Sequence, residues 1–337
     1  MRFVDAATTA RLLPFDSLIA ALRRAFVTGC EVPLRHSHSI AHPANPATAA
    51  NTGDPALPAG TVLLMPAWRI GGRLGLKTVT IFPANRAVGQ PALHSVYTLF
   101  DATTGEPLAQ LDGNQITSRR TAAASALAAS FLAREDASRL LVVGAGRVAA
   151  LMAPAMQAVR PIAQVTVWSR STAAAQALAA QLREQGFDAS ATDDLPAAVR
   201  RAHIVSCATL ATAPLIHGAW LQAGTHLDLI GSFKPDMREA DVECFARSRV
   251  YCDTSEALAK SGDVLRAIAE GGFAADALQG TLAALCRGEC AGRGDAQERT
   301  LFKSVGTALE DLAAAELVFD ALPSSEASWV NAGPPTS

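Results

Sequence analysis

The first residues with a recognisable chemistry follow a short apolar run at 140–143. Gly144-Ala-Gly146 comes directly after this run, and small and apolar residues then open what reads as a helix. This strand–turn–helix order is typical of a dinucleotide-binding turn, in which one glycine makes the turn and the next lets the backbone approach a pyrophosphate at the helix N-terminus. An ordinary tight turn is the alternative. The predicted cofactor contacts here are Gly144, Ala145, Gly146, Arg147 and Val148.

The following strand, 165–168, indicates which dinucleotide binds. An NAD site usually offers Asp or Glu to the ribose at the tip of this strand, whereas the chain reads Ser169-Arg-Ser171. A guanidinium binds phosphate through paired, charge-assisted hydrogen bonds. Ser169, Arg170 and Ser171 are therefore predicted to bind the 2′-phosphate of NADPH, with NADH as the second choice. In the alternative interpretation Arg170 is a solvated loop residue and Ser171 only caps the helix 172–184.

Composition excludes several classes of partner. The chain has 337 residues, half of them hydrophobic, a formal net charge of −2 and six cysteines. Without a basic run or a stretch of about 18 apolar residues, neither nucleic acid nor a membrane is expected as a partner. The cysteines fit no zinc module and no secretory signal is present, so we expect reduced thiols, no metal and a cytoplasmic location.

Hydrophobic periodicity divides the chain into two kinds of segment. The first 115 residues contain an amphipathic helix at 16–28, a Pro- and Gly-rich loop at 44–60, and β-like runs at 61–65, 74–81, 95–101 and 108–111. From residue 117, helices and strands alternate: the helices are 117–134, one from 147, 172–184 and 304–321, and the strands are 139–143, 165–168, 204–208, 226–230 and 250–253. Such alternation predicts a doubly wound parallel sheet with helices on both faces.

Four segments carry a family resemblance. They are Gly75-Leu-Lys-Thr-Val-Thr-Ile-Phe-Pro-Ala-Asn85, Asp112-Gly-Asn-Gln-Ile-Thr-Ser-Arg-Arg-Thr-Ala-Ala123, Val143-Gly-Ala-Gly146 and Leu301-Phe-Lys-Ser-Val-Gly306. Together, and in this order, they resemble the ornithine cyclodeaminase/mu-crystallin family over nearly the whole chain. The resemblance implies an α/β protein whose Rossmann-type domain, residues 117–300, is inserted into an α+β substrate and dimerisation domain made of residues 1–116 plus 301–337. It also implies a homodimer with a nicotinamide cofactor.

The resemblance further implies three cations around a substrate carboxylate, at the positions of Arg35, Lys77 and Arg120. A carboxylate leaves water only for charge-assisted donors. Lys77 lies in an apolar strand, where an unpaired lysine is costly, and Arg120 lies near a helix N-terminus, where the dipole disfavours a cation. Lys77 is also the predicted catalytic residue, as proton donor to an imine or as the group that fixes the carboxylate. Arg35 has the alternative of being a surface residue.

Two acidic residues of a cyclodeaminase are replaced in this chain. The aspartate that follows the strand 226–230 aligns with Phe233, and the glutamate two residues before Met65-Pro66 aligns with Leu63. Phenylalanine cannot transfer a proton, so the lyase reaction lacks its base. The segment 231–239 instead resembles the ketimine reductases of the family. It implies NAD(P)H-dependent reduction of a cyclic imino acid in hydroxyproline catabolism, Δ1-pyrroline-2-carboxylate to L-proline or the six-membered homologue to L-pipecolate.

Three other activities stay open: ornithine cyclodeaminase, amino-acid dehydrogenase, and non-catalytic ligand binding of the crystallin type. Further cofactor contacts are expected where predicted strands end at the carboxyl edge of the sheet, although plain loop structure explains these positions as well. Lys303 lies within the last motif, near the expected site, with helix-end solvation as its alternative. The remaining predicted cofactor residues are Thr121, Thr209, Gly231 and Ser232.

Overall fold

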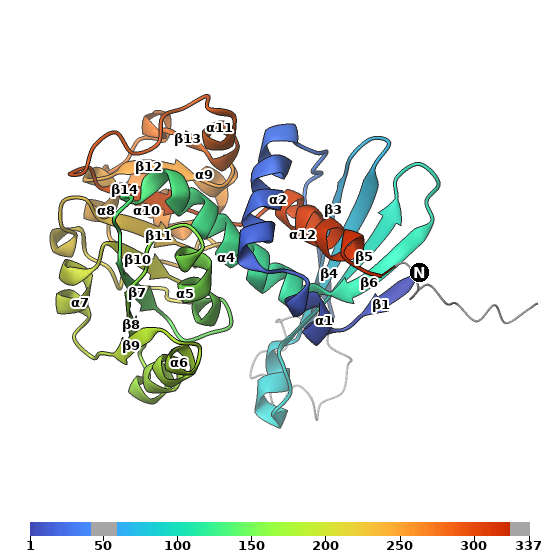
Figure 1. Ribbon diagram of the computed structural model, residues 1–337, viewed down its shortest axis with the longest axis horizontal. Helices are drawn as coiled ribbons and strands as arrows, with labels where there is room; N and C mark the ends of the chain where they lie inside the picture. The colour runs from blue at the N-terminus through green and yellow to red at the C-terminus, as the bar shows by residue number, and fades with distance from the viewer. Residues whose placement is uncertain (42–58, 324–337) are drawn as a thin grey trace, which may run out of the picture. The chain divides into compact units, whose positions relative to one another are not determined.

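The computed structural model describes residues 1–41 and 59–323, which form two compact units (Figure 1). Unit 1 comprises Met1–Pro14, Gly29–Thr117 and the chain from Ala308 onward, and unit 2 comprises Phe15–Thr28 and Ser118–Thr307. The predicted loop at 44–60 lies outside the described residues as far as position 58. No helix in the described ranges is long and apolar enough to cross a membrane.

Unit 1 is a six-stranded sheet with the order β1-β6-β5-β4-β3-β2, antiparallel except for the β1–β6 pair. The predicted strands are confirmed. Alternate residues of β4, namely Gly75, Lys77 and Val79, are buried, and α12 packs against β3, β4 and β5. The elements are β1 (Arg2–Val4), α1 (Ala6–Arg11), β2 (His36–Ile40), β3 (Gly60–Trp68), β4 (Arg73–Ile81), η1 (Pro83–Val88), β5 (Leu93–Asp101), β6 (Pro107–Asp112) and α12 (Ala308–Asp320).

Unit 2 contains an eight-stranded parallel sheet with the order β13-β12-β14-β11-β10-β7-β8-β9. Its strands are β7 (Arg139–Val143), β8 (Gln164–Trp168), β9 (Asp188–Ala191), β10 (Ile204–Cys207), β11 (His226–Leu229), β12 (Arg249–Cys252), β13 (Gly280–Thr281) and β14 (Thr300–Lys303). Its helices are α2 (Phe15–Thr28), α4 (Gly113–Leu132, which begins in unit 1), α5 (Ala149–Gln157), α6 (Thr172–Glu184), α7 (Leu195–Arg201), η2 (Gly218–Trp220), α8 (Val242–Ala246), α9 (Ala257–Lys260), α10 (Gly262–Ala269), η3 (Ala275–Ala277) and α11 (Leu282–Arg287).

The strand order confirms the predicted α/β fold with a doubly wound sheet. Successive strands run outward from β7 to β8 and β9 on one side, and from β10 to β11 on the other, where β14 lies between β11 and β12. The order therefore reverses between β7 and β10. In open α/β sheets ligands bind outside the carboxyl ends of the strands at such a switch point. The turns after β7 and β10 flank this switch point, and the turn after β11 lies next to them.

Three helices begin two or more residues away from the start that the sequence predicts. Helix α4 begins at Gly113 rather than at 117, because the Asp112 side chain accepts the Gln115 N–H at 2.7 Å and caps the helix. Thr117 therefore lies inside the helix, and Arg120 lies in its second turn rather than near its N-terminus. Helix α5 begins at Ala149 instead of 147. Helix α12 begins at Ala308 instead of 304, because strand β14 and the positive φ of Gly306 (79°) precede it.

Candidate active site

Lys77 lies at the centre of the sheet in unit 1. Its register partners are Met65 on β3 and Tyr97 on β5. Its Nζ is 2.6 Å from Oδ2 of Asp311 on α12, and the two side chains are 3% and 0% exposed. A buried ammonium or carboxylate is stable only when an opposite charge lies close to it. The structure thus gives the buried lysine of β4 an anionic partner on α12 that the sequence analysis missed.

The pair lies beside a tightly packed tyrosine. A Cβ placed on Gly75 would lie 1.8 Å from the Tyr97 hydroxyl oxygen, so the ring fills the space that the glycine leaves. Burial, and next the charge of Asp311, raise the pKa of Tyr97 well above its ordinary value. Tyr97 therefore stays protonated beside the Lys77–Asp311 pair.

The other predicted residues of unit 1 lie in more open surroundings. Arg35 is exposed and immediately precedes β2, an edge strand of the sheet. Leu63, which aligns with the glutamate of cyclodeaminases, is half-buried on β3 and pairs with Val79. Its side chain is apolar, so this position offers no acid to a substrate amine.

Arg120 is a buried cation of unit 2, 6% exposed. Its guanidinium packs on Gly306, where an added Cβ would lie 2.6 Å from Nη1. The carboxylate of Asp253 accepts the backbone N–H groups of Val305 (2.7 Å) and Gly306 (2.6 Å). Burial raises the pKa of Asp253, while these hydrogen bonds and the Arg120 charge act in the opposite direction. The final motif of the sequence thus forms the turn on which Arg120 rests.

The neighbours of Arg120 on α4 have different surroundings. The Arg119 guanidinium lies over the ring of Phe15, 5.4 Å from its centroid. Thr121 is half-buried. The two adjacent arginines therefore face different environments, and the cation–π contact gives Arg119 a structural role.

The turn after β7 has the geometry that a dinucleotide needs. Gly144 has φ = 121°, and a Cβ there would lie 2.6 Å from the carbonyl oxygen of Ala208, the residue that follows β10 by one. Gly146 is exposed, and a Cβ built on it would meet nothing within 4 Å. Ala145 and Val148 are half-buried and Arg147 is exposed. The first glycine is thus required by the fold, whereas the second leaves the backbone open to a phosphate.

The tip of β8 carries both a serine that caps a helix and an exposed arginine. Arg170 and Ser171 are exposed and Ser169 is half-buried. The Ser171 hydroxyl accepts the Ala174 N–H at 3.3 Å, which confirms Ser171 as the N-cap of α6. Ser169 Oγ accepts the Ser171 N–H at 3.4 Å. Capping orders this turn and leaves the Arg170 side chain at the surface.

The turns after β10 and β11 meet through a buried carboxyl group. Glu239 Oε1 accepts hydrogen bonds from the N–H (2.7 Å) and hydroxyl (2.8 Å) of Thr209. A Cβ on Gly231 would lie 2.3 Å from the Thr209 carbonyl oxygen and 2.5 Å from Cδ of Glu239. Ser232 is fully buried with φ = 54°. Gly144, Thr209 and Gly231 are therefore brought together at one edge of the sheet.

Two residues of this edge differ from what the sequence indicated. Lys303 is a fully buried residue of β14 whose Nζ donates to the carbonyl of Gly231, so helix-end solvation is wrong. Glu239 was not among the predicted site residues, although it lies within the segment 231–239 that carries the reductase resemblance. Its burial follows from tertiary packing, and a lone glutamate after a strand gives no local signal of that.

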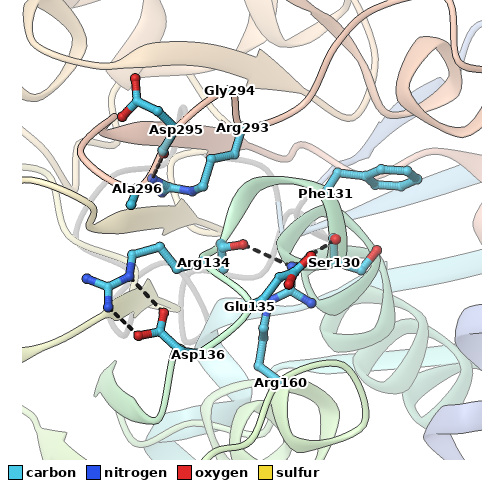
Figure 2. A pocket seen from close by; sticks show the side chains of 11 residues that line it. Ser130, Phe131, Arg134, Glu135, Asp136, Arg160, Arg293, Gly294, Asp295 and Ala296 are labelled. Carbon is cyan, nitrogen blue, oxygen red and sulfur yellow. Dashed lines mark hydrogen bonds and ion pairs between the residues drawn. The ribbon is translucent and has the colours of Figure 1, made fainter.

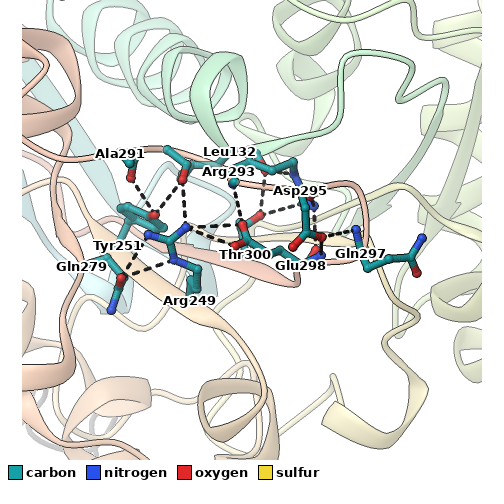
Figure 3. Close-up of polar contacts among 12 residues, drawn as sticks. Leu132, Arg249, Tyr251, Gln279, Ala291, Arg293, Asp295, Gln297, Glu298 and Thr300 are labelled. Carbon is teal, nitrogen blue, oxygen red and sulfur yellow. Dashed lines mark hydrogen bonds and ion pairs between the residues drawn. The ribbon is translucent and has the colours of Figure 1, made fainter.

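A hollow of about 480 Å³ is lined in part by the segments that precede β7 and β14, at the opposite edge of the sheet (Figure 2). Its arginines serve the structure. Arg160 donates to the carbonyls of Ser130 (2.8 Å) and Ala133 (2.9 Å), and Arg293 donates to that of Leu132 (2.7 Å), so the last carbonyls of α4 are satisfied. Arg293 also donates to the Thr300 hydroxyl at 3.1 Å, and Figure 3 draws this contact. Because these arginines bind backbone carbonyls at the end of α4, the hollow is lined by a helix-capping network and is not assigned as the cofactor site.

Comparison with known proteins gives one consistent family. The model of the ornithine cyclodeaminase/mu-crystallin family matches residues 31–326. The chain is 43% identical over 263 residues to a Δ1-pyrroline-2-carboxylate reductase of Paracoccus denitrificans, covering 77% of this chain and 83% of the relative. It is 36% identical to the Δ1-pyrroline-2-carboxylate reductase of Colwellia psychrerythraea, covering 96% and 99% of the two chains.

Solved structures agree with the sequence comparison. Thermococcus litoralis Δ1-pyrroline-2-carboxylate reductase, in complex with NADH and L-proline, superposes with a TM-score of 0.85 at 30% identity, covering 95% of this chain and 97% of that one. An archaeal alanine dehydrogenase dimer with bound NAD gives a TM-score of 0.84 at 26% identity, covering 95% of each chain. Both neighbours hold a nicotinamide cofactor.

Proposed function

Because this chain belongs to the ornithine cyclodeaminase/mu-crystallin family, we propose that it reduces the C=N bond of a cyclic ketimine with a nicotinamide cofactor. The first substrate is Δ1-pyrroline-2-carboxylate and the product L-proline. The observation that carries the proposal is the similarity to reductases of this substrate. Two such relatives are 43% and 36% identical to this chain in sequence, and a solved reductase structure of the same fold is 30% identical. The apolar replacements Phe233 and Leu63 support a reductase over a cyclodeaminase.

Lys77 is the proposed catalytic residue, and its ion pair with Asp311 supports a permanent charge. If Lys77 gave up its proton, the buried carboxylate of Asp311 would lose its cation at 2.6 Å, which is strongly unfavourable. We therefore propose that Lys77 stays an ammonium and holds the substrate carboxylate, with Arg35 and Arg120 as further ligands. Fixing the carboxylate orients the ring carbon that accepts the hydride.

The proposed cofactor contacts lie mainly in the turns at the carboxyl edge of the sheet. When bound, the reduced nicotinamide supplies the hydride. The open backbone at Gly146, with Ala145, Arg147 and Val148, supports a pyrophosphate contact after the Gly144 turn. The exposed Arg170, flanked by Ser169 and Ser171, supports NADPH over NADH. The further proposed contacts are Thr121, Thr209, Gly231 and Ser232.

The proposal also covers the oligomeric state, the cellular location and the pathway. The dimeric alanine dehydrogenase neighbour supports a homodimer. All six cysteines are free thiols, which supports a cytoplasmic location. Reduction of Δ1-pyrroline-2-carboxylate would place the protein in hydroxyproline catabolism.

The test follows the oxidation of NADPH and of NADH by the purified chain, with Δ1-pyrroline-2-carboxylate and with its six-membered homologue. A parallel assay measures ammonia released from L-ornithine. We expect rapid oxidation of the reduced cofactor with the pyrroline and no ammonia. Ammonia from ornithine without cofactor consumption would instead identify a cyclodeaminase, and ammonia-dependent reduction of pyruvate an alanine dehydrogenase.

A further inference from the structure

The turns after β10 and β11 are joined to a buried charged cluster beneath the carboxyl edge of the sheet. Glu239, Asp263 and Lys303 have side chains that are at most 1% exposed. Lys303 Nζ donates to the Gly231 carbonyl and lies 3.4 Å from Asp263 Oδ2. Asp263 Oδ1 accepts the N–H groups of Glu239 (2.8 Å) and Ala240 (3.0 Å). The cluster therefore links the loop that contains Glu239 to strand β14.

The same cluster holds Ser232 in its uncommon backbone conformation. Ser232 Oγ accepts the Asp263 N–H at 2.8 Å and donates to the Met237 carbonyl at 2.7 Å. A positive φ outside glycine costs free energy and persists only where surrounding contacts impose it, as happens at binding sites. Ser232 directly follows Gly231, so the hydrogen bonds of its side chain fix the turn after β11.

Glu239 is the member of the cluster that reaches the neighbouring turn. Both of its contacts with Thr209 go to Oε1, and Gly231 packs against its carboxyl carbon. The Glu239 side chain therefore contacts both turns, and Gly231 also packs directly on the Thr209 carbonyl oxygen. They follow β10 and β11, and Gly144 of the turn after β7 packs on Ala208 beside them.

We propose that Glu239 is a positioning residue: from beneath the carboxyl edge it holds the turns at Thr209 and Gly231 in the conformation that receives the nicotinamide cofactor. The inference rests on the proposed function, because it takes these turns as cofactor contacts. Glu239 acts through Thr209 and Gly231. A buried carboxyl group is expensive to keep when an apolar residue would fill the same space. Its location between the turns after β10 and β11 accounts for its presence.

The neutral form of Glu239 suits this role. Burial raises the pKa of Glu239 to about 8, and the nearby Lys303 charge limits the rise. The carboxyl group is therefore largely protonated near neutral pH and accepts the two Thr209 hydrogen bonds through Oε1. A glutamine offers an oxygen acceptor of the same reach, whereas leucine offers none and aspartate is one methylene shorter.

The experiment measures dissociation constants of NADPH and NADH for the purified full chain by titration of protein fluorescence, with KM, kcat and Tm alongside. We expect Glu239→Leu and Glu239→Asp to weaken binding of both cofactors about tenfold, and Glu239→Gln to stay close to the wild type. Asp228→Ala is the stability control. It removes buried hydrogen bonds to Ser125 (2.9 Å) and Ser206 (2.6 Å), so it should lower Tm without changing cofactor affinity.

Several outcomes decide the proposal. Unchanged cofactor affinity in folded Glu239→Leu, or in Glu239→Asp if the leucine variant does not fold, would overturn it. A loss in Glu239→Gln as large as in Glu239→Leu would also contradict it, because the glutamine keeps the acceptor. A wild type that binds the cofactor but does not reduce the pyrroline would defeat the proposed substrate alone. A wild type that binds neither cofactor would overturn both proposals.

Discussion

The ammonium of Lys77 on β4 lies 2.6 Å from a carboxylate oxygen of Asp311 on α12, and both side chains are almost fully buried. This ion pair connects the sheet of unit 1 to the helix that covers it. Removing one partner of a buried pair leaves an uncompensated charge, whereas removing both leaves none. Single and double variants of this pair can therefore distinguish the stabilising role of the Lys77 charge from its proposed role in catalysis.

We expect Lys77→Met and Asp311→Asn each to lower the free energy of unfolding by about 3–5 kcal/mol. The double variant should recover most of that loss but no turnover, because the cation for the substrate carboxylate is absent. Denaturant unfolding and steady-state kinetics measure the two effects, and NADPH affinity serves as the control that should persist. Additive losses in the double variant would show that the two charges do not stabilise each other.

Arg120→Leu tests the predicted carboxylate ligand on α4. Loss of a charge-assisted contact should lower kcat/KM on the order of 100-fold while NADPH still binds. Arg119→Leu is the matched control, since Arg119 lies one residue away and contacts the Phe15 ring. Near-native kinetics in Arg120→Leu, or equal losses in both variants, would mean that the substrate site is misplaced.

The two glycines of the β7 turn should respond differently to alanine. At Gly144 a Cβ would collide with the Ala208 carbonyl at 2.6 Å, and φ is 121°, so Gly144→Ala should destabilise the fold by about 1–3 kcal/mol. Gly146 has open space, so Gly146→Ala should keep its Tm and weaken cofactor binding by crowding the pyrophosphate. A Gly146→Ala variant with wild-type affinity for both cofactors would remove this turn from the site.

Local signals accounted for much of the fold. The bounds of α6 and its Ser171 cap, the strand 139–143 and the turn at Gly144 were predictable because a cap, an apolar run and a glycine act on their immediate neighbours. The start of α4 was missed because Gly113 and Asn114 are poor helix formers and concealed the Asp112 cap.

The buried carboxyl groups were not predictable in the same way. Asp311 lies in the first turn of α12, where an acidic residue is ordinarily explained by the helix dipole. Its burial against Lys77 depends on how α12 packs on a sheet more than 200 positions earlier in the chain. Glu239 likewise becomes a site residue only when β10, β11 and β14 lie side by side. Such contacts belong to tertiary structure and leave no local pattern.

Arg170→Asp tests the cofactor preference. The guanidinium is exposed at the tip of β8, so its replacement by a carboxylate should repel a 2′-phosphate and favour ribose hydroxyls. The ratio of kcat/KM for NADPH to that for NADH should fall at least about tenfold. Arg200→Asp, at an exposed position of α7, is the charge-matched control. An unchanged ratio would exclude Arg170 from phosphate binding.

The pH dependence of stability should carry the signature of Glu239. Its pKa rises from an ordinary 4.5 to about 8 on folding, so the folded chain binds this proton more tightly than the unfolded chain does. The stabilising contribution of this proton is therefore full below pH 4.5 and is lost as the pH rises through about 8, with a slope of at most about 1.4 kcal/mol per pH unit.

The Glu239→Gln variant has no such proton to lose. Denaturant unfolding between pH 5 and 8 should thus show the wild type losing stability relative to the glutamine variant. The pKa of Asp228 is also raised, to about 6, but Asp228 titrates in both proteins, so its contribution cancels from the difference. Parallel curves for the two proteins would mean that Glu239 ionises normally in the folded state.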